Sequence, residues 1–462
     1  MRDLLITAIV LAALVYAFRR PWAGVILWTW LSIMNPHRLA FGFAYDAPFA
    51  AMAAGVTLMA LLLTKDPVKL PSSGPVRFLI LFIIWMTITT AFAYHPGESF
   101  DQLTKVFKIQ LMTLVALAVL HEKKHILMFV WINALSLGFY GVKGGVHTIL
   151  TGGGSRVWGP GGFIGGNNEI GLAMLVIIPF LYYAFLQAKP HWLRLGLIGA
   201  MLLTTIAVLG TQSRGAFVGI AAMGVVLWWR APRKLLSGAL IITTAVVALG
   251  VMSEQFAERM GTIKTFEDDS SAVGRLYAWQ TAVNIANSRP FGAGFAMYTQ
   301  AISDRYAPGL NFEGKIDSKI LEARAAHSIY FQVLGEHGWV GLVLYVGVFV
   351  LTWRIAARLR KRTRNDAELK WVHQLASMSQ VALVGFAVGG AFLSLAYFDL
   401  PYNIMIILVV TSRWLSQRNP APPAAAPNPP ITAQTLSSAA SARAPTEPRA
   451  AGRPQRQIGR HS

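Results

Sequence analysis

The chain of 462 residues contains no cysteine, and charged residues make up only 13% of it. The absence of cysteine excludes disulfide bonds, thiolate metal sites and cysteine nucleophiles. Acidic residues are especially scarce, since 21 Asp and Glu stand against 41 Lys and Arg, which gives a formal net charge of +20. With so few charged side chains, the sequence does not fit a soluble globular protein of this length.

Hydrophobic residues take the place of the missing charges. They account for 54% of the chain, and the mean hydropathy is +0.48. The apolar runs lack the alternation of barrel strands, so we predict an all-α, multi-pass membrane protein. The thirteen runs span approximately residues 3–18, 21–35, 47–64, 77–94, 104–120, 125–149, 169–187, 192–210, 214–230, 235–253, 327–357, 374–397 and 401–416.

Basic clusters follow the odd-numbered runs, as at Arg19–Arg20, at Lys123–Lys124 and, most densely, at 354–370. The positive-inside rule therefore places these connections in the cytoplasm and the even-numbered ones outside. The first run lacks a convincing cleavage site, and we interpret it as retained. We favour about twelve membrane helices with both ends in the cytoplasm, and the alternative is thirteen with the amino terminus outside; the carboxyl end is cytoplasmic in both. Contact with anionic membrane lipids explains the basic charge, so no nucleic-acid partner is implied.

This topology divides the chain into four segments. The long outer loop contains Leu276, Trp279, Val283 and Ala286 at helical spacing, which predicts a small helical cap. The Pro- and Ala-rich carboxyl-terminal segment predicts a disordered cytoplasmic tail. The segments are 1–253 with outer loops 151–168 and 211–214, the loop 254–326, the helices of 327–416, and the tail 417–462.

The stretch from Arg324 to Gly341 carries the strongest chemical signal. His327-Ser328 is followed by nine residues, then Gly338 and, three positions later, Gly341. A helix that begins at the membrane surface would hold His327 at its wet end, with both glycines a few turns deeper on roughly one face. An imidazole there can titrate near neutral pH, which makes His327 a candidate general base. His337 competes with it, but we interpret that residue as a buried, satisfied histidine.

Three arginines are predicted on the same side of the membrane as His327. Arg214 follows T-Q-S and opens an apolar helix, where its guanidinium and the free N–H groups would suit a phosphate. Arg275 and Arg289 lie in the cap. The alternatives are that Arg214 extends to lipid headgroups and that the other two are solvated, paired with the acidic residues of 267–269.

The loop 151–168 contains eight glycines but lacks the context of a phosphate-binding loop. It could instead fold over a substrate groove lined by Arg156, Asn167 and Asn168, or it could be a flexible connector. His121 to His125 matches the H-E-x-x-H pattern of zinc proteases. No third ligand is apparent, so we interpret this match as accidental and predict no metal site.

His327-Ser328, nine residues and Gly338-x-x-Gly341 resemble the H-[NSQ]-x9-G-x-x-G signature of bacterial lipopolysaccharide O-antigen ligases. The T-Q-S-R-G segment at 211–215 is similar to the arginine-bearing segment that these ligases share with O-antigen polymerases. The resemblance covers roughly residues 1–416. Position 344 is Leu where a third glycine sometimes follows. The sequence also looks similar to the O-glycosylation ligases of exopolysaccharide systems, which are relatives of the same superfamily.

The resemblance implies a GT-C-like bundle in the bacterial inner membrane with its active site facing the periplasm. It implies transfer of a glycan from undecaprenyl pyrophosphate to a lipid A–core acceptor, with inversion and without a metal or other cofactor. His327 would be the base. The residues expected to bind substrate are Arg214, Arg275, Arg289, Arg156, Asn168 and Arg324.

Three alternatives stay open at this stage. An O-antigen polymerase uses the same donor but a second lipid-linked glycan as acceptor. A lipid or solute transporter would move its substrate without forming a covalent product. An intramembrane metalloprotease would use His121 and His125 as zinc ligands.

Overall fold

The computed structural model describes residues 1–231, 233–250, 270–306 and 324–418. Within these ranges the chain is helical, with no strand, as predicted. Residues 1–415 form one compact unit, and a second unit begins at Ser416. The predicted tail from 419 onward and the acidic residues at 267–269 lie outside the described residues.

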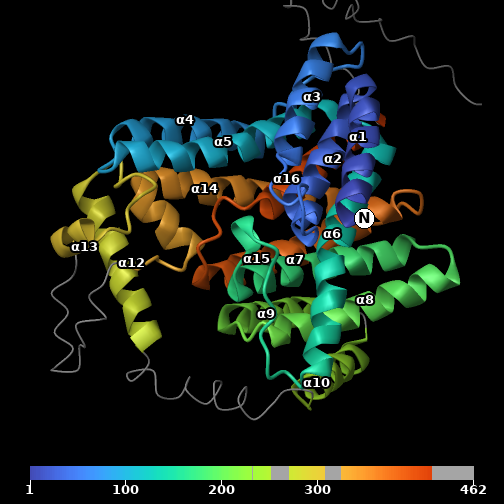
Figure 1. Cartoon of the computed structure of the whole chain (residues 1–462). Coiled ribbons are helices and arrows are strands. Elements are labelled where there is room, and N and C mark those ends of the chain that lie inside the picture. Colours follow the sequence, from blue (N-terminus) through green and yellow to red (C-terminus); the bar gives the residue numbers. More distant parts are fainter. Residues whose placement is uncertain (232, 251–269, 307–323, 419–462) are drawn as a thin grey trace, which may run out of the picture. The chain divides into compact units, whose positions relative to one another are not determined.

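Every apolar run of the sequence coincides with a helix (Figure 1). The cap is also helical in its described part, and its helix α12 begins at Ser270. The α-helices are α1 (Arg2–Arg19), α2 (Pro21–Met34), α3 (Phe49–Leu63), α4 (Gly74–Ala91), α5 (Pro96–Val119), α6 (Lys123–Leu150), α7 (Asn167–Gln187), α8 (His191–Gly210), α9 (Arg214–Arg230), α10 (Lys234–Gly250), α12 (Ser270–Ser288), α13 (Gln300–Tyr306), α14 (Ile329–Arg362), α15 (Lys370–Gly389) and α16 (Asp399–Arg418); short 3-10 turns include η5 (Gly390–Phe392).

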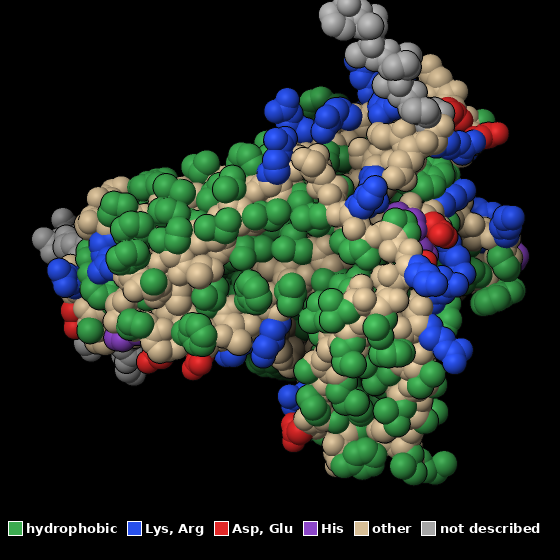
Figure 2. Space-filling view, turned by 90° about the horizontal axis from the view of Figure 1, so that it is seen from above, with side chains coloured by type: hydrophobic (Ala, Val, Ile, Leu, Met, Phe, Trp, Pro, Cys, Tyr) green, Lys and Arg blue, Asp and Glu red, His purple; other side chains and the backbone are tan. Residues whose placement is uncertain are grey.

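Among the described residues, seven helices are long and apolar enough to cross a membrane: α4 to α8, α14 and α15. The apolar helices α2 and α3 are shorter. Large hydrophobic side chains lie exposed on their flanks, and Figure 2 shows broad hydrophobic surface over the helices. A bundle with such a surface suits lipid rather than water. The structure therefore supports a multi-pass membrane protein, although it does not establish the predicted count of about twelve crossings or a GT-C-like fold.

The basic connections meet at one end of the bundle. Arg20 forms an ion pair with Asp66 at 3.4 Å. Lys69 accepts a hydrogen bond at its carbonyl from Arg413 (2.8 Å), and its own N–H donates to the carbonyl of Ala118 (3.3 Å). These contacts join the α1–α2, α3–α4 and α5–α6 connections with the end of α16. We call this the basic end.

The connections predicted to face outside meet elsewhere. Val157 N donates to the carbonyl of Gly210 (3.1 Å), which joins the glycine-rich loop to the α8–α9 turn. Tyr94 N donates to the carbonyl of Ala293 (3.0 Å), which joins the α4–α5 turn to the cap, here residues 270–306 with 324–326. We call this the cap end. In each of the two groups, connections that the sequence predicts on the same side of the membrane contact one another.

Small residues allow close packing of the helices at the centre of the bundle. At Gly145 of α6 an added Cβ would meet the backbone of Leu203 on α8, and at Gly141 it would meet the side chain of Thr204. Glycine contacts of this kind hold membrane helices together, because apolar side chains gain little from leaving a lipid environment.

The signature glycines break α14 rather than lying on one face of a continuous helix. Gly338 has φ 67 and ψ −172, a combination open only to glycine, so the expected single helix is two helical segments joined at a kink. A Cβ at Gly338 would collide with the carbonyl of Pro290, and one at Gly341 would collide with the side chain of His337. The two glycines of the G-x-x-G motif therefore both make the kink possible: Gly338 adopts its backbone conformation, and Gly341 leaves room for the His337 side chain.

The kink removes helical partners from three consecutive carbonyl groups of α14. The cap and α4 supply new donors, so no unsatisfied carbonyl is left at this break. Ala293 N donates to Gly335 O (2.9 Å), Gly294 N donates to Glu336 O (3.0 Å), and Trp85 Nε1 donates to His337 O (2.8 Å). Figure 1 shows α12 beside the beginning of α14.

Buried polar side chains lie directly before the kink in the chain. Glu336 accepts hydrogen bonds from the hydroxyl of Tyr397 and from Gln332 Nε2 (3.4 Å). His337 is fully buried, as expected, and its Nδ1 bonds with the Thr89 hydroxyl at 2.7 Å. Its Nε2 has no hydrogen-bond partner among the described residues, so the ring is satisfied at only one nitrogen. A buried carboxyl in a membrane helix is costly unless hydrogen-bonded, and Tyr397 fills that need.

We expect Gly338→Ala to destabilise the protein by about 1–3 kcal/mol or more, because alanine cannot adopt the positive φ without strain and its Cβ would collide with the cap. Gly199→Ala on α8 is the matched control, since nothing lies within 4 Å of the added Cβ and alanine favours the helix by about 1 kcal/mol. Thermal unfolding in detergent measures both. Equal unfolding temperatures would contradict the role assigned to the kink.

Candidate functional site

His327 lies in a strained turn immediately before α14. Its φ is 42, in the left-handed region that side chains other than glycine seldom adopt. Ser328 follows in an extended conformation at the N-cap position, and α14 begins at Ile329. The imidazole is partly buried, so water still reaches it. Strain of this kind is tolerated where the surrounding structure holds it, often at functional sites.

Trp279 of α12 holds the turn in place. Its Nε1 donates a hydrogen bond of 2.6 Å to the carbonyl of Ala326, the residue before His327. The indole also stacks on Phe331 of α14, with ring centroids 4.8 Å apart and planes 11° from parallel. These contacts fix the backbone on both sides of the histidine to the cap.

Two guanidinium groups lie near His327. Burial lowers the pKa of His327 from its ordinary value of 6.5, and the positive charges of Arg275 and Arg324 lower it further. Arg275 is one helical turn before Trp279, and the side chain of Arg324 packs over Gly274, where an added Cβ would lie 2.9 Å from Nη1. The imidazole is therefore held neutral at neutral pH, with a proton-accepting nitrogen.

Arg214 lies at the start of α9. It is the first residue of that helix, whose N-cap Ser213 accepts a hydrogen bond from Ala216 N (3.3 Å). The next residue, Gly215, packs against Phe392 of η5, where an added Cβ would lie 3.0 Å from the phenylalanine Cβ.

The turn η5 reaches the His327 region from its other side. The ring of Phe392 is 6.4 Å from that of Trp279, and Gly390 packs against Ile329. The start of α9, with Arg214, and the start of α14, with His327, thus pack against the same turn.

The glycine-rich loop is docked against the turn before Arg214. Arg156 Nε donates to Gln212 Oε1 (3.2 Å), Gln212 Nε2 donates to Gly153 O (3.0 Å), and Asn167 Nδ2 donates to Thr211 O (2.8 Å). The loop is therefore not an unattached connector. Arg156 is held beside the turn that leads into Arg214, and Asn168 occupies the first turn of α7, half buried.

The structure does not bring Arg289 to His327. Arg289 follows the far end of α12 and is about 20 Å along the helix axis from Arg275. Its Nη2 donates to the carbonyl of Phe92 (2.7 Å), and its guanidinium carbon is 3.9 Å from the ring centroid of Tyr94. Sequence spacing could not separate the two arginines, because the length and direction of α12 decide where each lies.

The H-E-x-x-H match does not form a zinc-protease helix. His121 precedes α6, which begins at Lys123, and its Nδ1 bonds with the carbonyl of Val119 at 2.8 Å. His125 is buried, and its ring stacks on that of Trp22 with the two ring centroids 4.5 Å apart. Both lie at the basic end. Within the described ranges, His, Asp and Glu side chains form no group of three that could hold a metal ion.

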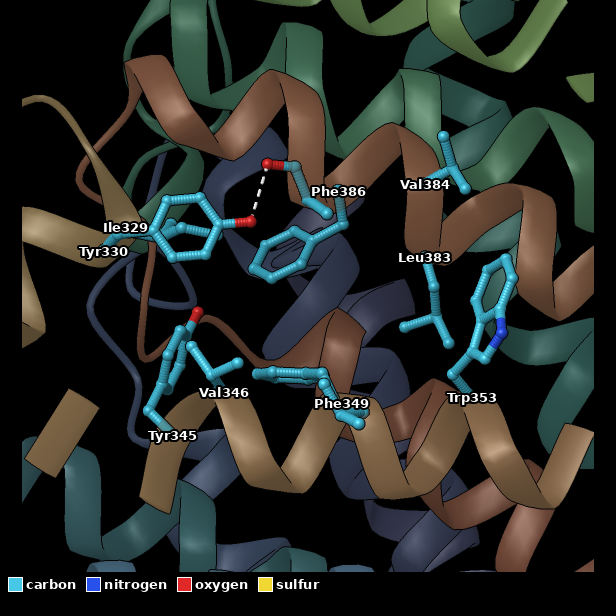
Figure 3. A pocket seen from close by; sticks show the side chains of 11 residues that line it. Ile329, Tyr330, Tyr345, Val346, Phe349, Trp353, Leu383, Val384 and Phe386 are labelled. Atoms are coloured by element: carbon cyan, nitrogen blue, oxygen red, sulfur yellow. Dashed lines mark hydrogen bonds between the residues drawn. The ribbon is translucent and has the colours of Figure 1, made fainter. Parts of the chain in front are cut away.

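An apolar cavity of about 240 Å³ begins next to the histidine turn and was not anticipated from the sequence (Figure 3). It lies between α14 and α15, from Ile329 and Tyr330 near the cap end to Trp353. Tyr330 closes part of it by donating from its hydroxyl to the carbonyl of Ala387 (2.9 Å). Aromatic and branched side chains line it, as in a site for a hydrocarbon chain.

Two family models match the chain. Residues 199–346 match the O-antigen ligase family, and residues 1–185 match a family of unknown function. No curated protein matches the chain. The ligase match includes Arg214, Arg275, His327 and both signature glycines, so the resemblance found in the sequence is confirmed.

We expect Arg275→Gln to raise the pKa of His327, because it removes a nearby positive charge that disfavours the imidazolium. Arg289→Gln is the matched control. Arg289 lies about 20 Å along α12 from Arg275, which is beyond the electrostatic screening length of roughly 8–10 Å. The pKa of His327 should therefore stay unchanged in this variant. NMR titration of ¹³C-labelled histidine in the purified protein measures both. An equal shift in the two variants would contradict the placement of Arg275.

Proposed function

We propose that this member of the O-antigen ligase family, identified by residues 199–346, transfers a glycan from undecaprenyl pyrophosphate to a lipid A–core acceptor. The reaction takes place at the periplasmic face of the bacterial inner membrane, which is the side of the cap end. The observation that carries the proposal is the placement of the His327 imidazole beside two guanidinium groups, which lower its pKa, and next to Ile329 and Tyr330, where the lining of an apolar cavity begins.

His327 acts as the general base in this mechanism. The acceptor hydroxyl is a weak nucleophile until its proton is removed, and a neutral imidazole can take that proton as the new glycosidic bond forms. The bond between the anomeric carbon and the pyrophosphate oxygen breaks at the same time. Attack from the face opposite the leaving group inverts the anomeric centre.

The arginines stabilise the departing lipid pyrophosphate. Arg275 and Arg324 supply fixed positive charge beside His327, and Arg214 adds a guanidinium at the N-terminus of α9, where free N–H groups also favour an anion. Arg156 and Asn168 extend the same wall through the docked glycine-rich loop. The donor is already activated, and these cations can neutralise the developing charge, so the mechanism needs neither ATP nor a metal ion.

The cavity between α14 and α15 receives the isoprenoid chain of the donor. Its lining begins at Ile329 and Tyr330, within one helical turn of His327, so a chain held there could place its pyrophosphate near the arginines. Binding the chain at a distance from the reacting atoms positions the donor and lowers the entropy cost of the reaction.

A polymerase that extends a lipid-linked glycan is the second candidate, since the T-Q-S-R-G segment is similar in both types of enzyme. Both use the same donor and the same base, so the two differ only in acceptor. Product analysis separates them: glycan on lipid A–core identifies a ligase, and ladders on the carrier lipid identify a polymerase. A transporter would give flux in liposomes without either covalent product.

We expect His327→Ala to lower transfer by about 10²–10⁴-fold while donor binding persists, because only proton removal is lost. The assay uses proteoliposomes with purified donor and acceptor in EDTA. In the wild type, activity should fall on the acid side only below pH 6.5, as the depressed pKa of the base is crossed. Full activity of the variant would remove His327 from the mechanism, and loss of activity in EDTA would contradict metal independence.

We expect Val346→Trp to raise the KM for a donor with a full isoprenoid chain, because the indole fills the cavity between α14 and α15. A donor with a short chain that does not reach the cavity serves as the control and should keep its KM. Val218→Trp, on the exposed flank of α9, is the matched variant with the same added bulk. Equal effects on long and short donors would exclude the cavity as the chain site.

A further inference from the structure

A second cavity lies at the end of the cap that is remote from His327. Its volume is about 560 Å³, within the range of small-ligand sites, and in contrast to the cavity of Figure 3 its lining is polar. It is formed by the carboxyl end of α12, by α13 and by the turn between α4 and α5. The lining residues are Tyr94, Asn284, Ser288, Arg289, Arg305 and Tyr306.

Two guanidinium groups flank the cavity. That of Arg289 lies 3.9 Å from the ring centroid of Tyr94, and that of Arg305 lies 5.8 Å from the same centroid. Across the described residues, neither forms an ion pair with a carboxylate. Two arginines on one cavity wall without a counter-charge attract an anion, and their planar forks suit a phosphate or a carboxylate.

Besides the two arginines, the cavity is lined by two tyrosines, whose rings and hydroxyls suit a saccharide. The hydroxyls of Tyr94 and Tyr306 are hydrogen-bonded at 2.6 Å, and their rings are tilted by 56°. Burial acts to raise the pKa of Tyr94, but the hydrogen bond with Tyr306 and the charge of Arg289 lower it overall. Aromatic rings can stack on the apolar face of a sugar, and phenol, Ser288 and Asn284 groups can bind its hydroxyls.

Distance separates this cavity from the proposed reaction centre. Arg289 is about 20 Å along α12 from Arg275, so both sites cannot hold the same pyrophosphate. Both lie at the cap end, so one extended glycan could reach them together. Binding at a remote part of a substrate can be used to position its reacting end.

We propose that this cavity binds an acidic sugar residue, bearing a phosphate or a carboxylate, in the part of the glycan substrate that lies away from the transferred bond. The proposal rests on the proposed function, since that function supplies a glycan at this face. An anionic lipid headgroup presents similar charge but no sugar ring, and it is the competing source.

The test is saturation-transfer NMR on the full chain in detergent micelles, with glucose 6-phosphate, glucose and glycerol 3-phosphate as probes. We expect glucose 6-phosphate to bind, with saturation of its ring protons, and the other two to bind about tenfold more weakly. Arg305→Gln should lower the affinity for glucose 6-phosphate about tenfold through loss of one charge-assisted contact. Arg305 is exposed, so this variant should fold, and Tyr306→Phe gives an independent second change.

Arg194→Gln, in the first turn of α8 and outside both sites, is the matched control, and it should bind glucose 6-phosphate as the wild type does. Equal binding of glycerol 3-phosphate would overturn the sugar assignment in favour of a lipid headgroup. Unchanged affinity in both Arg305→Gln and Tyr306→Phe would overturn the site itself. Binding that persists in a wild-type protein without transferase activity would instead count against the proposed function alone.

Discussion

The structure depends on satisfying the backbone where α14 breaks. In a membrane bundle a carbonyl without a donor is costly, and Gly338 removes the helical partners of three carbonyls in succession. Their new donors come from the 293–294 segment of the cap and from Trp85 of α4. The kink therefore attaches the cap to the bundle by main-chain hydrogen bonds, which fix position far better than apolar contact does.

The attachment of the cap decides where the chemistry lies. Because the 293–294 segment is held at the kink, α12 lies along the first part of α14 and carries Trp279 to the turn before Ile329. Trp279 then fixes the backbone around His327, and Arg275 lies one helical turn before Trp279 in α12. Arg275 of the cap, His327 and the kink glycine Gly338 are thus held in place by the same set of contacts.

Charge at the cap end is arranged in two groups rather than one. Near His327, burial and the charges of Arg275 and Arg324 both lower the pKa of the imidazole and so favour its neutral form. At the far end of α12, Arg289 and Arg305 surround a tyrosine pair. The separation gives the protein two cationic regions, one at each end of α12, and the two proposals assign them to the pyrophosphate and to a distant part of the glycan.

The sequence alone determined the helical class and, over the described residues, the positions of the apolar helices, because hydrophobic run length is a local property. It also pointed to His327, whose family match at 199–346 is confirmed. Only the tertiary structure decided that Gly338 breaks α14, that Arg275 and Arg324 reach His327, and that Arg289 does not. Those facts depend on the direction of α12 and on which backbone donors meet which carbonyls. Such pairings join residues tens to hundreds of positions apart, and no periodicity in one chain records them.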